Sequence, residues 1–355
     1  MIAPALGLLY VSNFLPAGHN RSYSEDLAGR LEHRGWRVTR TSSVVARGAR
    51  LLDMLRTVWT RRQDYDVGVI DVFSGAAFVW AEAVCTALRL IGKPYVLALH
   101  GGSLPEFGAR WPRRVRRLLG SARAVTAPSD FMRVRMRAYR GDITLVRNAV
   151  DAGAFAFVAR TAARPRLIWI RAFHAIYNPG LAVDVLAQVS RRFPEARLTM
   201  IGPDKRDGSL AAALARARAL GIASRVAVIG HVPHAAIAGH LAEADVFVNT
   251  TDVDNTPLSV LEAMATGLCV ISTSVGGLPY LLEHERSALL VPPRDPVAMA
   301  RAVERVLVDP ELAERISRGA RARADQHDWG EVLDQWTATL TGAITGAVAG
   351  AVPGG

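Results

Sequence analysis

Short, almost uninterrupted apolar runs alternate with amphipathic segments along most of this chain. Four runs in the first half have the length of β-strands: 6–14, 36–42, 66–72 and 94–100. The segments 23–35 and 77–92 carry apolar residues at helical spacing. Runs that are apolar on both faces are typical of parallel sheets covered by helices on each side. The alternation therefore predicts an α/β fold.

The same alternation starts again near residue 166, after the segment 149–166 has lost periodicity. At 355 residues the chain is twice the usual length of a domain. We predict Rossmann-like domains over 1–160 and 161–327, and a closing helix over 328–355 that packs back on the first domain and ends in a flexible Gly/Ala tail. Two such domains facing one another place a cleft between the carboxyl ends of their sheets, where α/β folds bind ligands.

Composition indicates a globular protein of the cytoplasm. The chain is 50% hydrophobic and 21% charged, and none of its apolar runs reaches the roughly 20 residues that span a bilayer. The apolar start lacks a basic leading region and a cleavage site, so we expect a buried first strand there. Cys85 and Cys269 lie inside apolar segments, which favours buried thiols in a reducing compartment over a disulfide or a metal cluster.

Positive charge is concentrated in the first half. The net charge is +11, and residues 1–155 hold 23 Lys and Arg against 12 Asp and Glu. Such a surface attracts anionic lipid or phosphorylated substrates. The stretch "RWPRRVRRLL" places Trp111, Val115, Leu118 and Leu119 among five arginines, which predicts an interfacial helix in peripheral contact with an anionic membrane. No motif that reads nucleic acid accompanies the arginines, and we expect no nucleic-acid partner.

The stretch "DNTPLSVLEAMATGLCVIS", residues 254–272, carries two carboxylates around a helix start. Thr256 before Pro257 predicts a capped helix with proline in its first position, and Gly267 ends it. The amino end of a helix offers free amides and partial positive charge to phosphate. Glu262 lies about 7 Å further along the axis, and Asp254 lies before the helix. Hydroxyl-binding carboxylates on both sides of a phosphate site suit a nucleotide-diphosphate sugar.

This stretch, continued to "STSVGGLP", resembles the acidic-x7-Glu segment of retaining glycosyltransferases of family 4, which have the GT-B fold. Further similar motifs follow in the family's order along nearly the whole chain: "LHGG", "APSDFM", "VRNAVDAGAF", "WIRAFHAIYNPG", "IGHVPHAAIAGH" and "RSALLVPPRDP". The resemblance implies transfer of a sugar from a UDP- or GDP-linked donor to a glycan, lipid-linked or small-molecule acceptor. It implies retained anomeric configuration, by front-face attack in which the leaving phosphate helps to deprotonate the acceptor, and no cofactor.

The resemblance also implies roles for individual residues. Asp254 would hold the hydroxyls of the transferred sugar, and His100, at the end of the run 94–100, would lie over that sugar as the second catalytic residue. Glu262 would hold the ribose hydroxyls. The remaining substrate-binding residues, for the base, the phosphates and the approach of backbone to the donor, are Gly18, Arg171, Val232, Thr256, Leu258 and Ser259.

Three positions differ from the family pattern. Asp254 stands where the family usually has glutamate, Tyr177 stands at the position of a lysine, and Tyr280 ends the "GGxPE" pattern. Because the missing lysine removes one phosphate-binding charge, we expect Lys205 or Arg206 to replace it.

Several other interpretations are open from the residues. The tripeptide "DVD" at 252–254 imitates a metal-binding Asp-x-Asp, and the histidines of "HVPHAAIAGH" could suggest zinc, but we expect no metal. A nucleotide-sugar epimerase and a glycosidase that uses the two carboxylates share the architecture. A non-catalytic nucleotide-sugar-binding relative is also compatible with the three departures.

Overall fold

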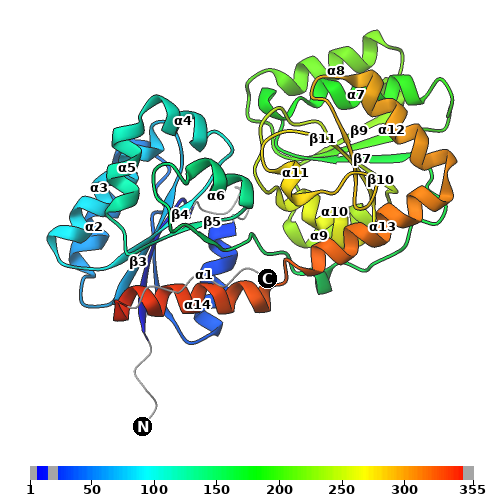
Figure 1. The fold of residues 1–355 in the computed structure, drawn as a ribbon. Coiled ribbons are helices and arrows are strands. Elements are labelled where there is room, and N and C mark those ends of the chain that lie inside the picture. The colour runs from blue at the N-terminus through cyan, green and yellow to red at the C-terminus, as the bar shows by residue number, and fades with distance from the viewer. Residues whose placement is uncertain (1–5, 15–22, 347–355) are drawn as a thin grey trace. The chain divides into compact units, whose positions relative to one another are not determined.

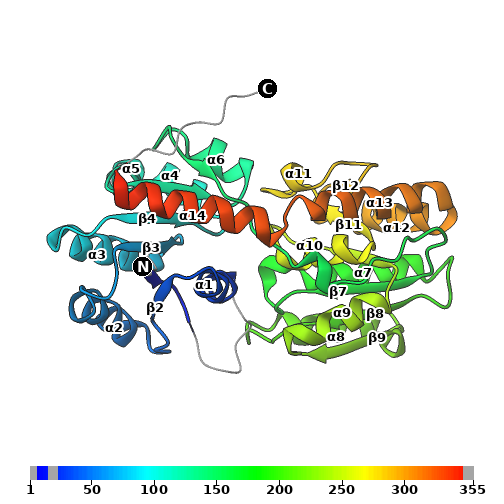
Figure 2. The same cartoon turned by 90° about the horizontal axis from the view of Figure 1, so that it is seen from below.

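The computed structural model describes residues 6–14 and 23–346, and the chain forms two compact units (Figure 1). Unit 1 combines residues 1–148 with 330–355, and unit 2 comprises residues 149–329. Each unit contains one six-stranded parallel sheet with helices on both faces (Figure 2). The predicted α/β fold is therefore confirmed for both halves of the chain.

The sheet of unit 1 has the strand order β2-β1-β3-β4-β5-β6, and all neighbouring strands are parallel. Its strands are β1 (Gly7–Val11), β2 (Arg37–Thr41), β3 (Val67–Val72), β4 (Tyr95–Leu99), β5 (Ala124–Ala127) and β6 (Thr144–Leu145). Its helices are α1 (Tyr23–His33), α2 (Arg47–Thr60), α3 (Ala77–Leu90), α4 (Leu104–Arg110), α5 (Pro112–Gly120), α6 (Asp130–Met136) and α14 (Trp329–Thr345). Every residue of β1, β3 and β4 is buried, as their apolar sequences require.

The sheet of unit 2 has the order β12-β11-β10-β7-β8-β9 and is also parallel throughout. Its strands are β7 (Arg166–Ile170), β8 (Arg197–Ile201), β9 (Val226–Gly230), β10 (Val246–Asn249), β11 (Cys269–Thr273) and β12 (Leu289–Val291). Its helices are α7 (Pro179–Val189), α8 (Ser209–Ala219), α9 (His234–Ala242), α10 (Leu258–Thr266), α11 (Leu278–Leu281), α12 (Pro296–Val308) and α13 (Pro310–Asp325). Short 3₁₀ turns occur at Ala152–Ala154, Ala175–Tyr177 and Ala223–Arg225.

Helix α2 is one of the elements that the sequence pattern did not predict. It buries Met54 and Val58 but leaves Leu52 and Trp59 exposed, so its apolar residues do not lie on a single face. An apolar pattern that covers two faces does not give a clear helical period.

The prediction that α5 is an interfacial helix with its apolar side exposed is wrong. Val115, Leu118 and Leu119 are buried in the core of unit 1, and of the four apolar residues named in that prediction only Trp111 is exposed. The apolar side of α5 therefore packs on its own unit, because the core of the sheet needs a covering helix there. What α5 presents to solvent is mainly arginine.

The segment 149–166, which has no regular pattern, packs on unit 2. Val150 and Phe155 belong to its core, and Arg160 is buried with its Nε 3.1 Å from Oδ1 of Asp245. Arg166 Nε donates to the other oxygen of Asp245 at 2.8 Å. One buried carboxylate thus fixes both this segment and the start of β7. Among the described residues, no helix combines the length and the apolar character needed to cross a membrane.

Candidate functional site

The order in which strands are added to the sheet of unit 2 reverses between β7 and β10. From β7 the chain adds β8 and β9 on one side, and from β10 it adds β11 and β12 on the other. At such a switch point, the loops that follow the two central strands diverge and leave room for a ligand at their carboxyl ends. Arg171 directly follows β7, and Asp254 lies in the loop after β10. Two predicted site residues are therefore placed at the position where this fold binds ligands.

Arg171 and Asp254 form an ion pair between Nη2 and Oδ2, and both side chains are largely buried. The Arg171 guanidinium also lies over the ring of Tyr177, 4.6 Å from its centroid. Burial lowers the pKa of Arg171, although Tyr177 and Glu262 act in the opposite direction. Tyr177, which stands where the family has a lysine, thus packs on the arginine. No feature of the sequence predicted this contact.

The loop of Asp254 is held against the segment that follows β11. Gly276 has φ +53°, and a Cβ there would overlap the carbonyl of Asp254. The amide of Gly277 donates to the same carbonyl at 3.1 Å, and Thr273 Oγ1 donates to the carbonyl of Thr251 at 2.7 Å. The two glycines are required because backbone packs directly on backbone here. The position of the Asp254 carboxylate is therefore fixed by its loop as well as by Arg171.

Helix α10 begins one residue later than predicted. Pro257 is its N-cap, with extended backbone, and Leu258 is its first helical residue. Thr256 precedes the cap and does not occupy it, because the proline carbonyl already accepts the first amides of the helix, from Val260 and Leu261. The amides of Leu258 and Ser259 have no acceptor among the described residues, and the Ser259 hydroxyl is buried without a partner there. Three donors at this end are thus available to an anion.

Glu262 is 6% exposed in α10, and its Oε1 lies 2.7 Å from Nε2 of His234. His234 is the first residue of α9, and Val232, assigned to the base, lies two residues before it and is partly buried. The histidine was considered in the sequence only as a metal ligand. In the structure it contacts Glu262, the candidate for binding the ribose. The signal that could have found it is its position at the start of a helix, next to Val232.

Each carboxylate of "DVD" has an arginine partner. Asp252 accepts from Arg294 at 2.9 and 3.0 Å, and Asp254 pairs with Arg171. Over residues 6–14 and 23–346, no group of three or more His, Cys, Asp or Glu side chains is arranged to hold a metal ion. Lys205 and Arg206 are exposed on the loop after β8.

In unit 1, His100 follows β4 and lies 3.0 Å through Nε2 from Oδ1 of Asp71 in β3. The other oxygen of Asp71 accepts a 2.5 Å hydrogen bond from Ser24 of α1. The His100 ring stacks on Phe73 with centroids 5.2 Å apart. Asp71 was missed from the sequence, although a lone acid in the apolar strand "VGVIDV" was the available signal. Gly18, the remaining candidate, lies outside the described residues.

Family models match both halves of the chain. The model described as Glycosyltransferase Family 4 matches residues 19–153, mainly in unit 1. The model described as Glycosyl transferases group 1 matches residues 164–309 in unit 2. The chain is built from two glycosyltransferase domains. All site residues of unit 2 described above lie within the second glycosyltransferase domain.

Curated relatives of these glycosyltransferase domains carry enzyme names. A glycogen synthase of Mycobacterium tuberculosis is 30% identical over 199 residues, which are 54% of this chain and 46% of that protein. A D-inositol 3-phosphate glycosyltransferase of Streptomyces avermitilis is 29% identical over 289 residues, 75% of this chain and 62% of the relative. The chain covers about half of the length of the curated relatives that it matches.

Solved structures share the GT-B fold of this chain. Sucrose-phosphate synthase from Thermosynechococcus elongatus superposes with a TM-score of 0.79 at 18% identity, over 94% of this chain and 97% of the other. Anabaena HepE in complex with UDP and glucose superposes with a TM-score of 0.76 at 17% identity, over 95% and 99% of the two chains.

Proposed function

We propose that the protein is a retaining hexosyltransferase that works without a metal. It moves a sugar from a nucleotide-diphosphate sugar to a glycan, lipid-linked or small-molecule acceptor of the cell envelope or of secondary metabolism. The observation that carries this proposal is the grouping of Arg171, Asp254, Glu262 and the free amides of α10 at the switch point of unit 2. Cation, amides and carboxylates in one place suit a diphosphate with a sugar at each end.

The donor would bind along the start of α10. The amides of Leu258 and Ser259 and the Ser259 hydroxyl receive the phosphates, with Arg171 beside them. Glu262 accepts hydrogen bonds from the ribose hydroxyls, Val232 meets the base through its backbone, and Asp254 accepts from the transferred sugar. We include Thr256 and Gly18 among the donor-binding residues. The HepE structure, a complex with UDP and glucose, supports a nucleotide-sugar donor.

In the reaction, the bond from the anomeric carbon to the leaving diphosphate breaks as the acceptor oxygen forms a bond on the same face. The acceptor proton passes to the departing phosphate oxygen, so configuration is retained. Fixed amides and Arg171 stabilise the negative charge of the diphosphate, which is the contribution that a preorganised polar site makes best. His100, oriented by Asp71, is the second residue that we assign to the transferred sugar.

We also include cytoplasmic location and peripheral contact with anionic membrane in this proposal, since lipid-linked acceptors lie there. The excess of arginine in residues 1–155 supports that contact.

The direct test is calorimetry with UDP, GDP and other nucleoside diphosphates, followed by incubation of the corresponding donors with candidate acceptors. Binding of one nucleotide and an α-linked product from an α-linked donor, unchanged by chelator, supports the proposal. Binding without transfer to any acceptor or to water would favour the non-catalytic relative. Hydrolysis of glycosides without nucleotide binding would favour a glycosidase.

A further inference from the structure

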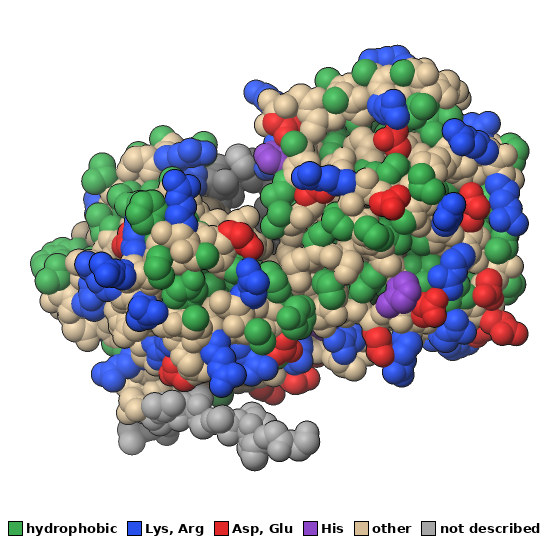
Figure 3. Space-filling model, turned by 45° about the horizontal axis from the view of Figure 1, so that its top comes forward, with side chains coloured by type: hydrophobic (Ala, Val, Ile, Leu, Met, Phe, Trp, Pro, Cys, Tyr) green, Lys and Arg blue, Asp and Glu red, His purple; other side chains and the backbone are tan. Residues whose placement is uncertain are grey.

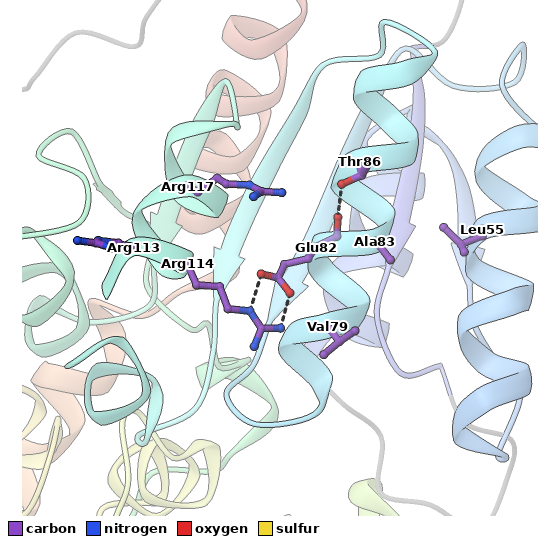
Figure 4. Close-up of a pocket in the computed structure, with 8 residues that line it drawn as sticks. All are labelled: Leu55, Val79, Glu82, Ala83, Thr86, Arg113, Arg114 and Arg117. Carbon is purple, nitrogen blue, oxygen red and sulfur yellow. Dashed lines mark hydrogen bonds and ion pairs between the residues drawn. The ribbon is translucent and has the colours of Figure 1, made fainter. Parts of the chain in front are cut away.

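Unit 1 has an open groove on the outer surface of helices α2, α3 and α5, and Figure 4 shows the side chains that line it. The groove has a volume of about 780 Å³. Leu55 comes from α2, four lining residues come from α3, and three arginines come from α5: Leu55, Val79, Glu82, Ala83, Thr86, Arg113, Arg114 and Arg117. None of these eight residues is among those proposed to bind the donor or the transferred sugar, so we treat the groove as a separate site.

The groove carries positive charge that has no acidic partner among the residues that the structure describes. Glu82 is its one carboxylate, and both of its oxygens accept from Arg114, with Nε to Oε1 at 2.6 Å. Arg113 and Arg117 are exposed, and neither has a carboxylate partner among the described residues. Figure 4 shows both guanidinium groups away from the Arg114–Glu82 pair. Two full positive charges are therefore available to an external anion.

An exposed apolar surface adjoins these arginines. Leu52, Leu55 and Trp59 share one face of α2 by their helical spacing, and Val79 of α3 lines the same groove as Leu55. Leu52 is 69% exposed, Trp59 57% and Val79 45%. Neighbouring exposed apolar residues of this kind mark an interaction surface more often than chance. On the left of Figure 3, Lys and Arg side chains likewise stand among hydrophobic ones on unit 1.

We propose that this groove is where the protein docks on an anionic lipid bilayer, with headgroup phosphates on Arg113 and Arg117 and the α2 residues Leu52 and Trp59 in the interfacial layer. The inference rests on the membrane contact included in the proposed function and gives it a location. The proposed docking surface is not the apolar side of α5 that the sequence suggested, because that side is buried in the core of unit 1. Arginines beside exposed apolar residues suit a lipid interface. A nucleic-acid surface would use the arginines and leave Leu52 and Trp59 unexplained.

The test is co-sedimentation of the full chain with vesicles of phosphatidylglycerol and phosphatidylcholine at low ionic strength. We expect binding to vesicles that contain phosphatidylglycerol and no binding to pure phosphatidylcholine. Arg113→Gln with Arg117→Gln should weaken binding by roughly tenfold or more. Leu52→Gln with Trp59→Gln should weaken binding while the preference for phosphatidylglycerol is kept.

Two matched control variants come from unit 2. Arg191→Gln with Arg218→Gln removes the same charge from exposed arginines, and Val297→Gln with Val308→Gln removes exposed apolar groups. Both should bind vesicles as the unchanged protein does. Three results would overturn the inference. They are an equal loss of vesicle binding in the control and groove variants, no binding to anionic vesicles, and arginine-dependent binding to duplex DNA without vesicle binding. Nucleotide calorimetry on the same proteins separates failure of the docking inference from failure of the proposed function. Intact nucleotide binding without vesicle binding would contradict only the docking inference.

Discussion

His234 at the start of α9 and Glu262 in the middle of α10 meet through a 2.7 Å contact between Nε2 and Oε1. Glu262 is buried while the His234 side chain is half exposed, so the contact orients the carboxylate at the edge of the site. The neighbouring side chain thus limits which oxygen of Glu262 is available to a ligand.

Replacing Glu262 with alanine should weaken nucleotide binding. If the carboxylate holds the ribose hydroxyls, its loss leaves them unpaired, at a cost of about 1.5–3 kcal/mol. Calorimetry with the nucleoside diphosphate identified in the screen measures this. His234→Ala should give a smaller loss, since it removes only the orienting partner. Unchanged affinity in Glu262→Ala would contradict the ribose role.

Asp254→Asn should separate binding from catalysis. The amide keeps an oxygen beside Arg171 but no longer carries the charge that pairs with the guanidinium. Nucleotide affinity should stay within about threefold, because Asp254 is assigned to the sugar, while turnover should fall by roughly a hundredfold. Calorimetry and a transfer assay with and without chelator decide this. Activity abolished by chelator would revive a metal at "DVD".

Asp71→Ala should lower turnover through His100 and leave the affinity for the nucleotide unchanged. The buried carboxylate bonds both His100 and Ser24, and its removal leaves two polar groups unpaired, which costs about 1–3 kcal/mol of stability. Turnover should fall as it does in His100→Ala, and the double variant should be no worse than His100→Ala alone. Additive losses in the double variant would show that Asp71 does not act through His100.

Asp245→Ala should destabilise unit 2 strongly. This buried carboxylate accepts from Arg160 and Arg166, and removing it leaves the buried Arg160 without its counter-ion. Loss of one partner from a buried pair costs about 3–5 kcal/mol. Urea denaturation measures the effect. Glu283→Gln, which breaks only the exposed pair with Arg286, should change stability by less than about 1 kcal/mol.

Stability should fall in alkali. Burial raises the pKa of Cys85 and of Cys269 from 9.0 to about 12, and that of Tyr65 and of Tyr95 from 10.0 to about 12. Above pH 9.0 the unfolded chain releases these protons first while the native state keeps them, so the free energy of unfolding decreases as pH rises towards 12.

Urea denaturation between about pH 8 and pH 11 checks this slope. Cys85→Ala with Cys269→Ala should remove the part of the slope that begins near pH 9.0. A stability that stays constant over this range would contradict the prediction. The two thiols should also react with an aromatic disulfide only after unfolding, since both are buried.

The fold class and the positions of most candidate residues could be predicted from the sequence alone. Apolar runs such as 66–72 and 94–100 indicated buried strands, because a parallel sheet covered by helices on both faces removes them from water. The helix start near Pro257 followed from the proline and its neighbours. These are local properties, which neighbouring residues decide.

Which side chains contact one another depends on how the strands and helices are arranged in space. The contacts of Arg171 with Asp254, Glu262 with His234 and His100 with Asp71 join residues 83, 28 and 29 positions apart. Whether the apolar side of α5 faces the core or a membrane could not be predicted either, since "RWPRRVRRLL" suits both. Strand order sets these contacts: the sheet brings the ends of β7 and β10 together, and no period in the sequence encodes that neighbour relation.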